Sequence, residues 1–380
     1  MSMEKITHKI YGDSPGKTTE LISFKLGSEQ AERKVYLQAA LHADEQPGIL
    51  VLHHLLKLLM QAEEQGLLIA QFVVFPMVNP LGMGDIGFRQ HQGRYDRASG
   101  VNFNRNWPDL CKAVAAQVAE QLTDDAQQNI QIVRSALKAW IAQQQPVTAL
   151  QQQRHIVLQS AFDADYILDL HCDNDALPHI FTVPQSATVM QDLSDWMGAA
   201  ATLLAETSGG YSFDEVWSKL WIDLAKIHPD KPLPLACHSA TLEYRGQFDT
   251  FDELNQEDAE RLYGFLQSQG LIGGELIRSR PEPTPAATDL AATEMTRVQQ
   301  AGLLAYKVKL GDVVKQGDVL ADLIVLEGEG AFVKRIPVLA GTDGVIISRN
   351  INKYVWPGCS IAKIVGKKKL ESRGDYLLED

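Results

Sequence analysis

The feature that most constrains the fold is an alternation of apolar strand-like runs with helix-like runs. Residues 34–42 (KVYLQAALH) and 71–79 (QFVVFPMVN) are nearly continuous apolar runs, and residues 48–66 between them have helical spacing. A run that is apolar on both faces is typical of a strand covered on both sides of its sheet. The strand–helix–strand order favours a parallel sheet with helices on its faces.

The same pattern continues towards residue 270. Residues 164–172 (ADYILDLHC) and 236–246 (ACHSATLEYRG) are two further apolar strands, and a helix around residues 252–269 precedes Gly270. Glycine is a common residue just past the end of a helix. We therefore predict one large α/β domain over this part of the chain.

Helical spacing also marks a segment that interrupts this pattern. Residues 110–161 are rich in Ala and Gln, and they predict an inserted pair or trio of helices. Thr148 with Gln151 indicates a capping box at the start of one helix, and Ser212 with Glu215 indicates a second one further on. The insertion directly follows an arginine-containing loop, residues 94–108, and from there it could narrow or cap a cleft.

The composition changes after residue 278. Residues 279–294 hold three prolines with many Ala and Thr, which is typical of a linker. Beyond them come short β-type runs separated by glycine turns, which predict a small all-β module of two similar halves. A chain of 380 residues is too long for one ordinary core. We predict an α/β domain over residues 1–285 and a β domain over residues 286–380.

Bulk properties exclude several classes of protein. The hydrophobic content of 45% and the charged content of 22% are those of a soluble globular protein. The net charge of −13 argues against nucleic acid or an anionic membrane as a partner. The sequence shows no apolar run of the length that a signal peptide or a bilayer span needs. Four scattered cysteines argue against a disulfide framework and for a reducing compartment, so we expect a cytoplasmic protein.

Polar residues end two of the predicted strands. His42 and Glu45 stand three residues apart in LHADEQPG, where the first strand gives way to a loop. In open parallel sheets, ligands bind outside the carboxyl ends of the strands. The alternative is a polar turn at a helix entry, with Glu45 facing the helix dipole. His171 ends the apolar run YILDLHC, and Asp169 shares its face because side chains alternate along a strand.

These residue types suit a metal. Two histidines and one carboxylate, with a fourth position left for water, make a standard catalytic zinc set. His171 would be the third ligand beside His42 and Glu45, and Asp169 would be a carboxylate that orients a ligand histidine. The alternative for His171 is a hydrogen-bonded histidine at a sheet edge.

Glu243 stands at the end of a third apolar strand, in SATLEYRG. A carboxylate is costly to bury unless it is paired, bound to a metal or used as a base. Beside a zinc site it would take a proton from water and pass it to a leaving nitrogen. The alternative is a salt bridge with Arg245, which the alternation of a strand places on the same face.

The loop RYDRASGVNFNRNWP, residues 94–108, offers cationic groups. Asn104 and Arg105 precede a Trp-Pro pair, and Arg97 lies seven residues before Asn104. The guanidinium fork binds carboxylates in a bidentate way, and asparagine adds a donor. Against the net charge of −13, these residues and a zinc ion would form a locally positive pocket for a substrate carrying carboxylates. The alternative is an ordinary solvated loop.

Taken in order, these motifs resemble a known family. H-x-x-E after a strand, N-R-N-W-P downstream of an arginine, D-L-H and T-L-E-Y are similar to the motifs of the zinc carboxypeptidase superfamily. The closer resemblance is to its succinylglutamate desuccinylase/aspartoacylase branch, over about residues 30–270. The resemblance implies a mixed, largely parallel sheet flanked by helices.

The resemblance also implies a role for each residue. One zinc ion per chain would be held by three residues: His42, Glu45 and His171. Glu243 would be the general base, and Arg97 would polarise the scissile carbonyl and stabilise its oxyanion. Asn104 and Arg105 would hold the substrate carboxylate. No motif places the tyrosine that closes over substrate in true carboxypeptidases, for which Tyr211 and Tyr244 are the candidates.

The C-terminal segment resembles the barrel-sandwich fold of biotinyl and lipoyl carriers, which members of this branch also carry. Its hairpin, VLEGEGAFVKRIPVLAGTDG, lacks the Met-Lys-Met or Asp-Lys-Ala tripeptide of a carrier. We therefore expect no swinging arm, and a role in packing, oligomerisation or shaping the mouth of the cleft.

Three functions follow as hypotheses. The first is a zinc-dependent amide hydrolase that deacylates a small N-acyl amino acid, with a small carboxylate-bearing substrate as its partner. The second is a metallocarboxypeptidase that acts on a small peptide or cell-wall fragment. The third is a non-catalytic binding protein or carrier, against which the complete ligand set and the missing carrier lysine both argue.

Overall fold

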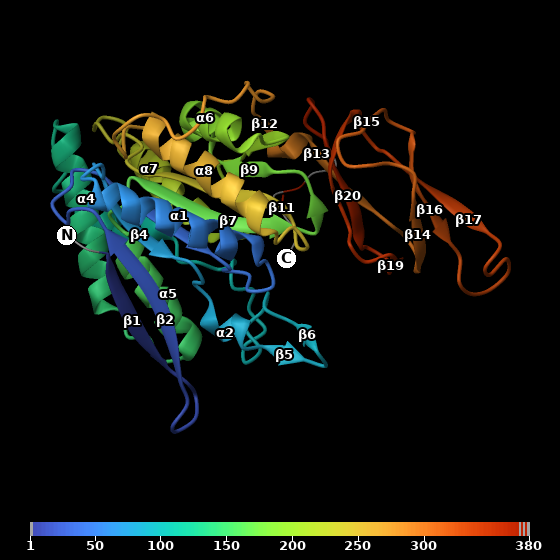
Figure 1. The fold of residues 1–380 in the computed structure, drawn as a ribbon, viewed down its shortest axis with the longest axis horizontal. Helices are drawn as coiled ribbons and strands as arrows, with labels where there is room; N and C mark the ends of the chain where they lie inside the picture. Colours follow the sequence, from blue (N-terminus) through green and yellow to red (C-terminus); the bar gives the residue numbers. More distant parts are fainter. Residues whose placement is uncertain (1–2, 372–373, 375–376, 378–380) are drawn as a thin grey trace.

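The computed structural model describes residues 3–371, 374 and 377. A nine-stranded sheet runs through the larger part of the chain in the order β1-β2-β4-β3-β7-β11-β9-β10-β12. Its strands are β1 (Glu4–Tyr11), β2 (Thr18–Leu26), β3 (Lys34–Ala39), β4 (Gln71–Phe75), β7 (Tyr166–Asp173), β9 (His179–Thr182), β10 (Ala201–Leu204), β11 (His238–Gly246) and β12 (Thr288–Asp289). Figure 1 shows helices on both faces of this sheet.

The centre of the sheet is parallel. β3 lies between β4 and β7, and β7 lies next to β11, with every one of these pairs parallel. The β1–β2 hairpin adds antiparallel strands at one edge, and β9 pairs antiparallel with β11. The predicted mixed, largely parallel sheet with flanking helices is therefore present.

Helices cover the two faces of the sheet and form two cores. One face carries α1 (Pro47–Glu64), α6 (Ala187–Met197) and α8 (Asp252–Ser268), and the other carries α3 (Leu110–Val118), α4 (Ala126–Gln143), α5 (Ala149–Ala161) and α7 (Phe213–Ile227). On β7, Ile167 belongs to one core and Leu168 to the other. Successive side chains of a strand point to opposite faces, so a doubly covered strand must be apolar at both positions.

The inserted segment consists of the three helices α3, α4 and α5. The capping box predicted at Thr148 and Gln151 is present at the start of α5. The one predicted at Ser212 and Glu215 was wrong, although α7 does begin at the next residue, Phe213. The Ser212 hydroxyl donates instead to Asp214 Oδ1 at 2.7 Å.

Two smaller antiparallel sheets follow the large one. The first contains β13 (Thr293–Arg297), β20 (Ser360–Val365), β18 (Gly344–Arg349) and β15 (Val313–Val314), and the second contains β17 (Arg335–Leu339), β16 (Val319–Ile324), β14 (Gly302–Tyr306) and β19 (Tyr354–Val355). They enclose a core of their own. The boundary near residue 285 stays a prediction; the large sheet ends with β12 and the smaller sheets begin with β13.

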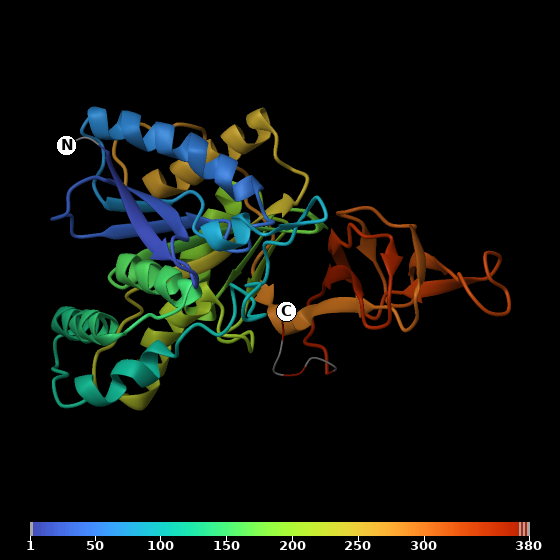
Figure 2. The ribbon, with the colours of Figure 1, turned by 90° about the horizontal axis from the view of Figure 1, so that it is seen from below.

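The smaller sheets are tied to the carboxyl end of β7. β8 (Asp175–Ala176), which follows β7 directly, pairs with β18. Arg349 donates to Asp175 at 2.7 Å, and Lys363 of β20 forms an ion pair with Asp173. Figure 2 shows the C-terminal sheets, in orange and red, beside the α/β part. The C-terminal sheets are thus anchored within a few residues of His171.

Five short elements complete the description: α2 (Pro80–Met83), the hairpin of β5 (Ile86–Gly87) with β6 (Gln90–His91), and the 3-10 helices η1 (Pro184–Ser186) and η2 (Leu290–Ala292). Among the residues described, no helix combines the length and the apolar character that crossing a bilayer requires.

Candidate functional site

Three neighbouring strands deliver the candidate site residues to one edge of the sheet. β3, β7 and β11 are adjacent and parallel, so their carboxyl ends lie side by side. Ala39 at the end of β3 pairs with Leu170, and His171 pairs with Glu243. The loop that leaves β3 before α1 carries His42 to the same edge, as the parallel arrangement requires.

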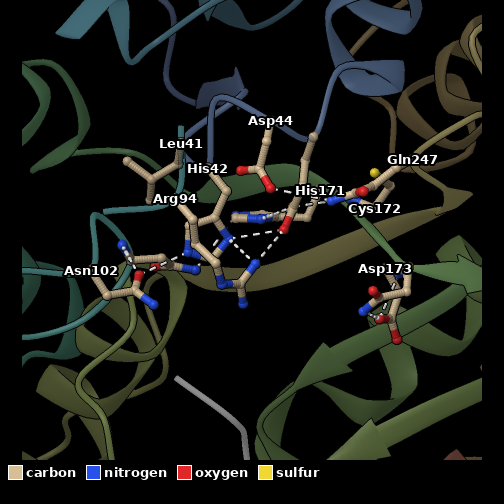
Figure 3. A network of polar contacts seen from close by, with 12 residues as sticks. Leu41, His42, Asp44, Arg94, Asn102, His171, Cys172, Asp173 and Gln247 are labelled. Carbon is tan, nitrogen blue, oxygen red and sulfur yellow. Dashed lines mark hydrogen bonds and ion pairs between the residues drawn. The ribbon is translucent and has the colours of Figure 1, made fainter. Parts of the chain in front are cut away.

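His42, Glu45 and His171 form one buried group. Nδ1 of His42 lies 3.0 Å from Glu45 Oε1, and Nδ1 of His171 lies 2.7 Å from Glu45 Oε2. One nitrogen or oxygen of each residue falls within 4.8 Å of the other two, a spacing at which the group could hold a metal ion. Their exposed fractions are 3%, 4% and 3%. Figure 3 shows the two imidazoles side by side, with Arg94 next to His42.

The outer nitrogens of both imidazoles are occupied by protein oxygens. His42 Nε2 lies 2.8 Å from Asn102 Oδ1, and His171 Nε2 lies 3.0 Å from Asp169 Oδ2. Gln38 donates to the other oxygen of Asp169 at 3.0 Å. With Nε2–H donated to these oxygens, Nδ1 of each ring is the atom that faces Glu45 and the position at which a metal would bind.

Asp169 lies where the alternation of the strand predicted. Asn102 was not predicted, although it stands in the same loop as Asn104. No spacing rule distinguishes one loop asparagine from another. Its position depends on the bridge between Tyr95 and Asn102, which folds the loop back on itself.

The charges of the group are strongly coupled. Burial, and then the Arg94 guanidinium, lower the pKa of His42 to about 4. Burial alone would lower the pKa of His171, but the Asp169 and Glu45 carboxylates outweigh it and hold that pKa well above its ordinary value. Burial would raise the pKa of Glu45, but the two histidines hold it well below its usual range. Without a metal, the group is therefore an ion pair between Glu45 and His171.

The structure does not place Arg97 in the site, so this part of the prediction was wrong. Its side chain is 77% exposed and donates to Asp85 Oδ1 at 3.1 Å. Arg94 lies at the site instead, where its Nη1 donates to Glu45 Oε1 at 2.9 Å. The chain turns back between Asp96 and Val101, which are joined by a backbone hydrogen bond. Arg97 is on the outside of that turn, and Arg94 is at its base.

Asn104 and Arg105 are both buried and both line the cavity described below. Asn104 Oδ1 accepts a hydrogen bond from the backbone of Phe213 at 2.8 Å, and Arg105 donates to the carbonyl of Asn104 at 2.9 Å. The amide nitrogen of Asn104 lies 3.5 Å from His171 Nε2. Asn104 and Arg105, which were predicted to bind the substrate carboxylate and are called the clamp, are thus adjacent to the candidate metal group. The loop that carries them, residues 94–108, is called the clamp loop.

The inserted helices support this loop from behind. Arg154 of α5 donates to the carbonyls of Arg105 at 2.7 Å and Asn106 at 2.9 Å. Residues 110–161 contribute nothing to the lining of the cavity. The insertion therefore holds the clamp loop in place and does not cap the cleft.

Glu243 lines the same cavity and is partly buried. Its Oε2 has no hydrogen-bond partner among the described residues. Arg245, the alternative partner, forms an ion pair with Asp258 of α8 instead, after a backbone irregularity that follows Glu243. Burial, and then the charge of Glu45, raise the pKa of Glu243 to about 8. A carboxylate in this state is a candidate acid–base group.

The cavity has a volume of about 950 Å³ and is walled by both parts of the chain. The α/β part supplies the residues above, together with Asp214 and Thr241. The C-terminal sheets supply, among others, Arg297, Arg349, Trp356 and Lys363.

Neither candidate tyrosine lines this cavity. Tyr244 is 1% exposed within the core of the α/β part, and Tyr211 is 38% exposed. The tyrosine of the true carboxypeptidases is therefore not matched by either side chain in this structure.

Comparison with known proteins agrees with these features. Residues 31–207 match the family model of the succinylglutamate desuccinylase/aspartoacylase catalytic domain. A search of curated proteins gives no match.

Solved structures share the whole fold. A protein of Shewanella amazonensis assigned to the succinylglutamate desuccinylase/aspartoacylase family is 24% identical, with a TM-score of 0.81, over 95% of this chain and 98% of that chain. One from Shewanella frigidimarina is 21% identical, with a TM-score of 0.83, over 96% and 97%. A succinylglutamate desuccinylase/aspartoacylase from Rhodobacter sphaeroides is 14% identical, with a TM-score of 0.66, over 96% of each chain. At these identities the likeness shows a common fold, including the C-terminal sheets.

Proposed function

The chain belongs to the succinylglutamate desuccinylase/aspartoacylase family through the catalytic domain that it carries, and on that premise we propose that it is a zinc-dependent hydrolase that deacylates a small N-acyl amino acid. The observation that supports this most is the pairing of two features in one cavity. A buried His-Glu-His group lies beside Glu243, a carboxylate with an oxygen that no described residue satisfies.

The donor set of the chain fits zinc. Two imidazole nitrogens and one carboxylate are a common set of protein ligands for catalytic zinc. Asn102 and Asp169 already hold the outer nitrogens of His42 and His171, so both rings are oriented for a metal, which would replace the Nδ1 proton of His171. A zinc ion held by His42, Glu45 and His171 would act as a Lewis acid and would lower the pKa of a bound water.

Glu243 is the proposed general base. Its carboxylate takes a proton from the attacking water and delivers it to the nitrogen of the scissile amide as that bond breaks. The pKa of about 8 belongs to the metal-free protein, where the charge of Glu45 opposes ionisation of Glu243. Compensation of that charge by a cation favours the carboxylate form, which is the form a base needs.

Arg94 takes the place that the sequence had assigned to Arg97. Its guanidinium lies beside Glu45 and lines the cavity. From there it would donate to the carbonyl oxygen of the substrate as negative charge develops on it. Asn104 and Arg105 would hold the substrate carboxylate, and the helix α5 keeps their loop in register through Arg154.

The C-terminal sheets are proposed to form a barrel-sandwich module without a carrier function. They contribute part of the cavity wall, and their exposed hairpin lacks the carrier tripeptide. A cavity of about 950 Å³ is within the range of pockets for small molecules, which favours an acyl amino acid over a long peptide.

The experiment that tests the proposal is a substrate panel. N-acetyl, N-succinyl and N-formyl amino acids are compared with dipeptides and short cell-wall peptides, all with the zinc-loaded full chain. Hydrolysis of acyl amino acids, lost in Glu243→Gln, supports the proposal. Cleavage of the peptides alone would instead support the metallocarboxypeptidase, and hydrolysis of neither class would overturn both.

A further inference from the structure

Asp214 is a buried carboxylate in the cavity wall that the proposed chemistry does not use. It lies in the first turn of α7, is 7% exposed and lines the cavity with the candidate metal group. Burial of a carboxylate is costly unless a charge or hydrogen bonds compensate. Within the part of the chain that the structure describes, Asp214 makes no ion pair, and its side chain accepts one hydrogen bond, from Ser212.

The neighbouring Glu215, in the same turn of α7, differs from Asp214 because most of its hydrogen-bond acceptor sites are filled by the protein. Glu215 accepts three hydrogen bonds: from the hydroxyl of Thr207 at 2.8 Å, and from the backbone and hydroxyl of Ser208 at 2.9 and 2.7 Å. A carboxylate has about four lone-pair sites, so Asp214 with one donor keeps most of its capacity. Because Asp214 lines the cavity, a bound molecule can supply the missing donors.

Asp214 is held beside the clamp. The backbone nitrogen of Phe213 donates to Asn104 Oδ1 at 2.8 Å, and the hydroxyl of Ser239 donates to the carbonyl of Asp214 at 2.6 Å. The residue is therefore fixed from both sides by the clamp loop and by β11. The cavity around it is lined by hydroxyl groups, from residues that include Ser208, Ser212 and Thr241.

We propose that Asp214 is a specificity residue that binds a positively charged amino group on the amino-acid part of the substrate. This rests on the proposed function and narrows it, since the preferred substrates become N-acyl derivatives of diamino acids. In this arrangement the substrate carboxylate binds Asn104 and Arg105, and the ammonium of the substrate side chain binds Asp214. The two positions are close, because Asp214 follows Phe213, whose backbone nitrogen donates to Asn104. The ammonium supplies up to three donors and compensates the buried charge.

The electrostatics around Asp214 agree with this role. Burial raises the pKa of Asp214 to about 6, and the nearby Asp169 and Glu215 charges add to the effect of burial. Two other carboxylates thus lie close enough to raise the pKa of Asp214, and an ammonium bound at Asp214 would offset their charge.

The test compares a pair of substrates of nearly equal size. Nα-acetyl-ornithine carries a side-chain ammonium, and Nα-acetyl-norleucine has a methyl-terminated chain of similar length. With the zinc-loaded full chain we expect a higher kcat/KM for acetyl-ornithine. In Asp214→Asn we expect the ratio between the two to fall by about 30-fold or more, the usual loss for a buried charge pair.

The matched control is Asp124→Asn, a carboxylate that is 94% exposed and lies between α3 and α4. It should leave the ratio unchanged. Circular dichroism and zinc content, equal in both variants and in the parent chain, show that the fold and the metal site are intact. A ratio near one in the parent chain, or a ratio that Asp214→Asn does not change, would overturn the role of Asp214 while hydrolysis itself still supports the function.

A second readout separates the two proposals if no acyl amino acid is hydrolysed. Calorimetric binding of ornithine and of norleucine to the zinc-loaded chain measures recognition without turnover. Tighter binding of ornithine that is lost in Asp214→Asn supports the ammonium site even if the hydrolase proposal fails. Equal binding of the two amino acids, or loss of both, overturns it.

Discussion

His171 and Glu243 occupy paired register positions on the adjacent parallel strands β7 and β11. Their side chains therefore leave the sheet at the same level, one towards Glu45 and the other into the open cavity. The candidate metal ligand and the candidate base, each at the end of an apolar strand, come together only because the strands are neighbours. This relationship places the predicted ligand and the predicted base in one site.

Zinc content is the first prediction. The purified chain should hold about one zinc ion, and His171→Ala should lose most of it, because a three-residue ligand set tolerates no missing member. Elemental mass spectrometry measures both. His54→Ala is the control, since His54 is also buried but contacts Asp252 at the start of α8 and does not line the cavity. Retention of zinc in His171→Ala would contradict the ligand assignment.

Replacement of the base is the second prediction. Glu243→Gln keeps the shape of the side chain but removes its basicity, so kcat should fall by about 10²- to 10⁴-fold. Zinc content should stay the same, because Glu243 is not in the ligand group. Steady-state kinetics on the same preparation used for metal analysis provides the test. Turnover within a few-fold of the parent chain would require another base.

The third prediction concerns stability and pH in the metal-free protein. The pKa of Glu243 is raised from 4.5 to about 8 by burial and then by Glu45. Between those two pH values the unfolded chain has lost this proton while the folded chain still holds it, so the raised pKa makes folding less favourable as pH rises. Glu243→Gln removes this penalty.

The variant should therefore gain free energy of unfolding over the parent chain at pH 8 but little at pH 5. Urea unfolding after chelation of metal measures the difference at both pH values. Glu20→Gln, at an exposed position of β2, should show no such change. A gain that is equal at pH 5 and pH 8 would show that ionisation of Glu243 is not its cause.

Arg94 and Arg97 provide the fourth prediction. Arg94→Ala should lower kcat/KM by about 10²-fold or more, the usual loss for a donor to a developing oxyanion. Arg97→Ala should remain within a few-fold of the parent chain, because its side chain is 77% exposed. Zinc content must be measured in both variants, since Arg94 also contacts Glu45. The opposite order of the two effects would show that the loop rearranges when substrate binds.

The clamp is the subject of the fifth prediction. Arg105→Ala should raise KM for an N-acyl amino acid by about 10- to 100-fold, because a charged hydrogen bond to the carboxylate is lost. The corresponding N-acyl amino acid amide, which lacks that charge, should be much less affected. Equal loss on the two substrates, measured by steady-state kinetics, would assign Arg105 to the structure of the loop instead.

Much of the site was predictable from local patterns. Polar residues stand at or just after the ends of apolar strands, a pattern that can be recognised within a few consecutive residues; they are His42, Glu45, His171 and Glu243. Asp169 followed from the two-residue period of a strand. The parallel sheet followed from the strand–helix–strand order, because this order permits few other arrangements.

The loop between β6 and α3 shows where such reasoning stops. Distance along the chain from Asn104 pointed to Arg97, but a backbone turn at residues 96–101 directs Arg97 outwards and leaves Arg94 at the site. Asn102 became a partner of His42 through the same turn. The conformation of an irregular loop depends on contacts with distant residues such as Arg154, which no local pattern encodes.

The sequence by itself determined the large sheet, the residues at the ends of its strands and the chemistry they favour, because strand period and residue type act locally. Only the tertiary structure decided which arginine faces the site, that Asp214 lines the cavity and that the C-terminal sheets form part of its wall. Those facts depend on contacts between residues far apart in the chain, such as Lys363 with Asp173, and such contacts exist only once the chain has folded.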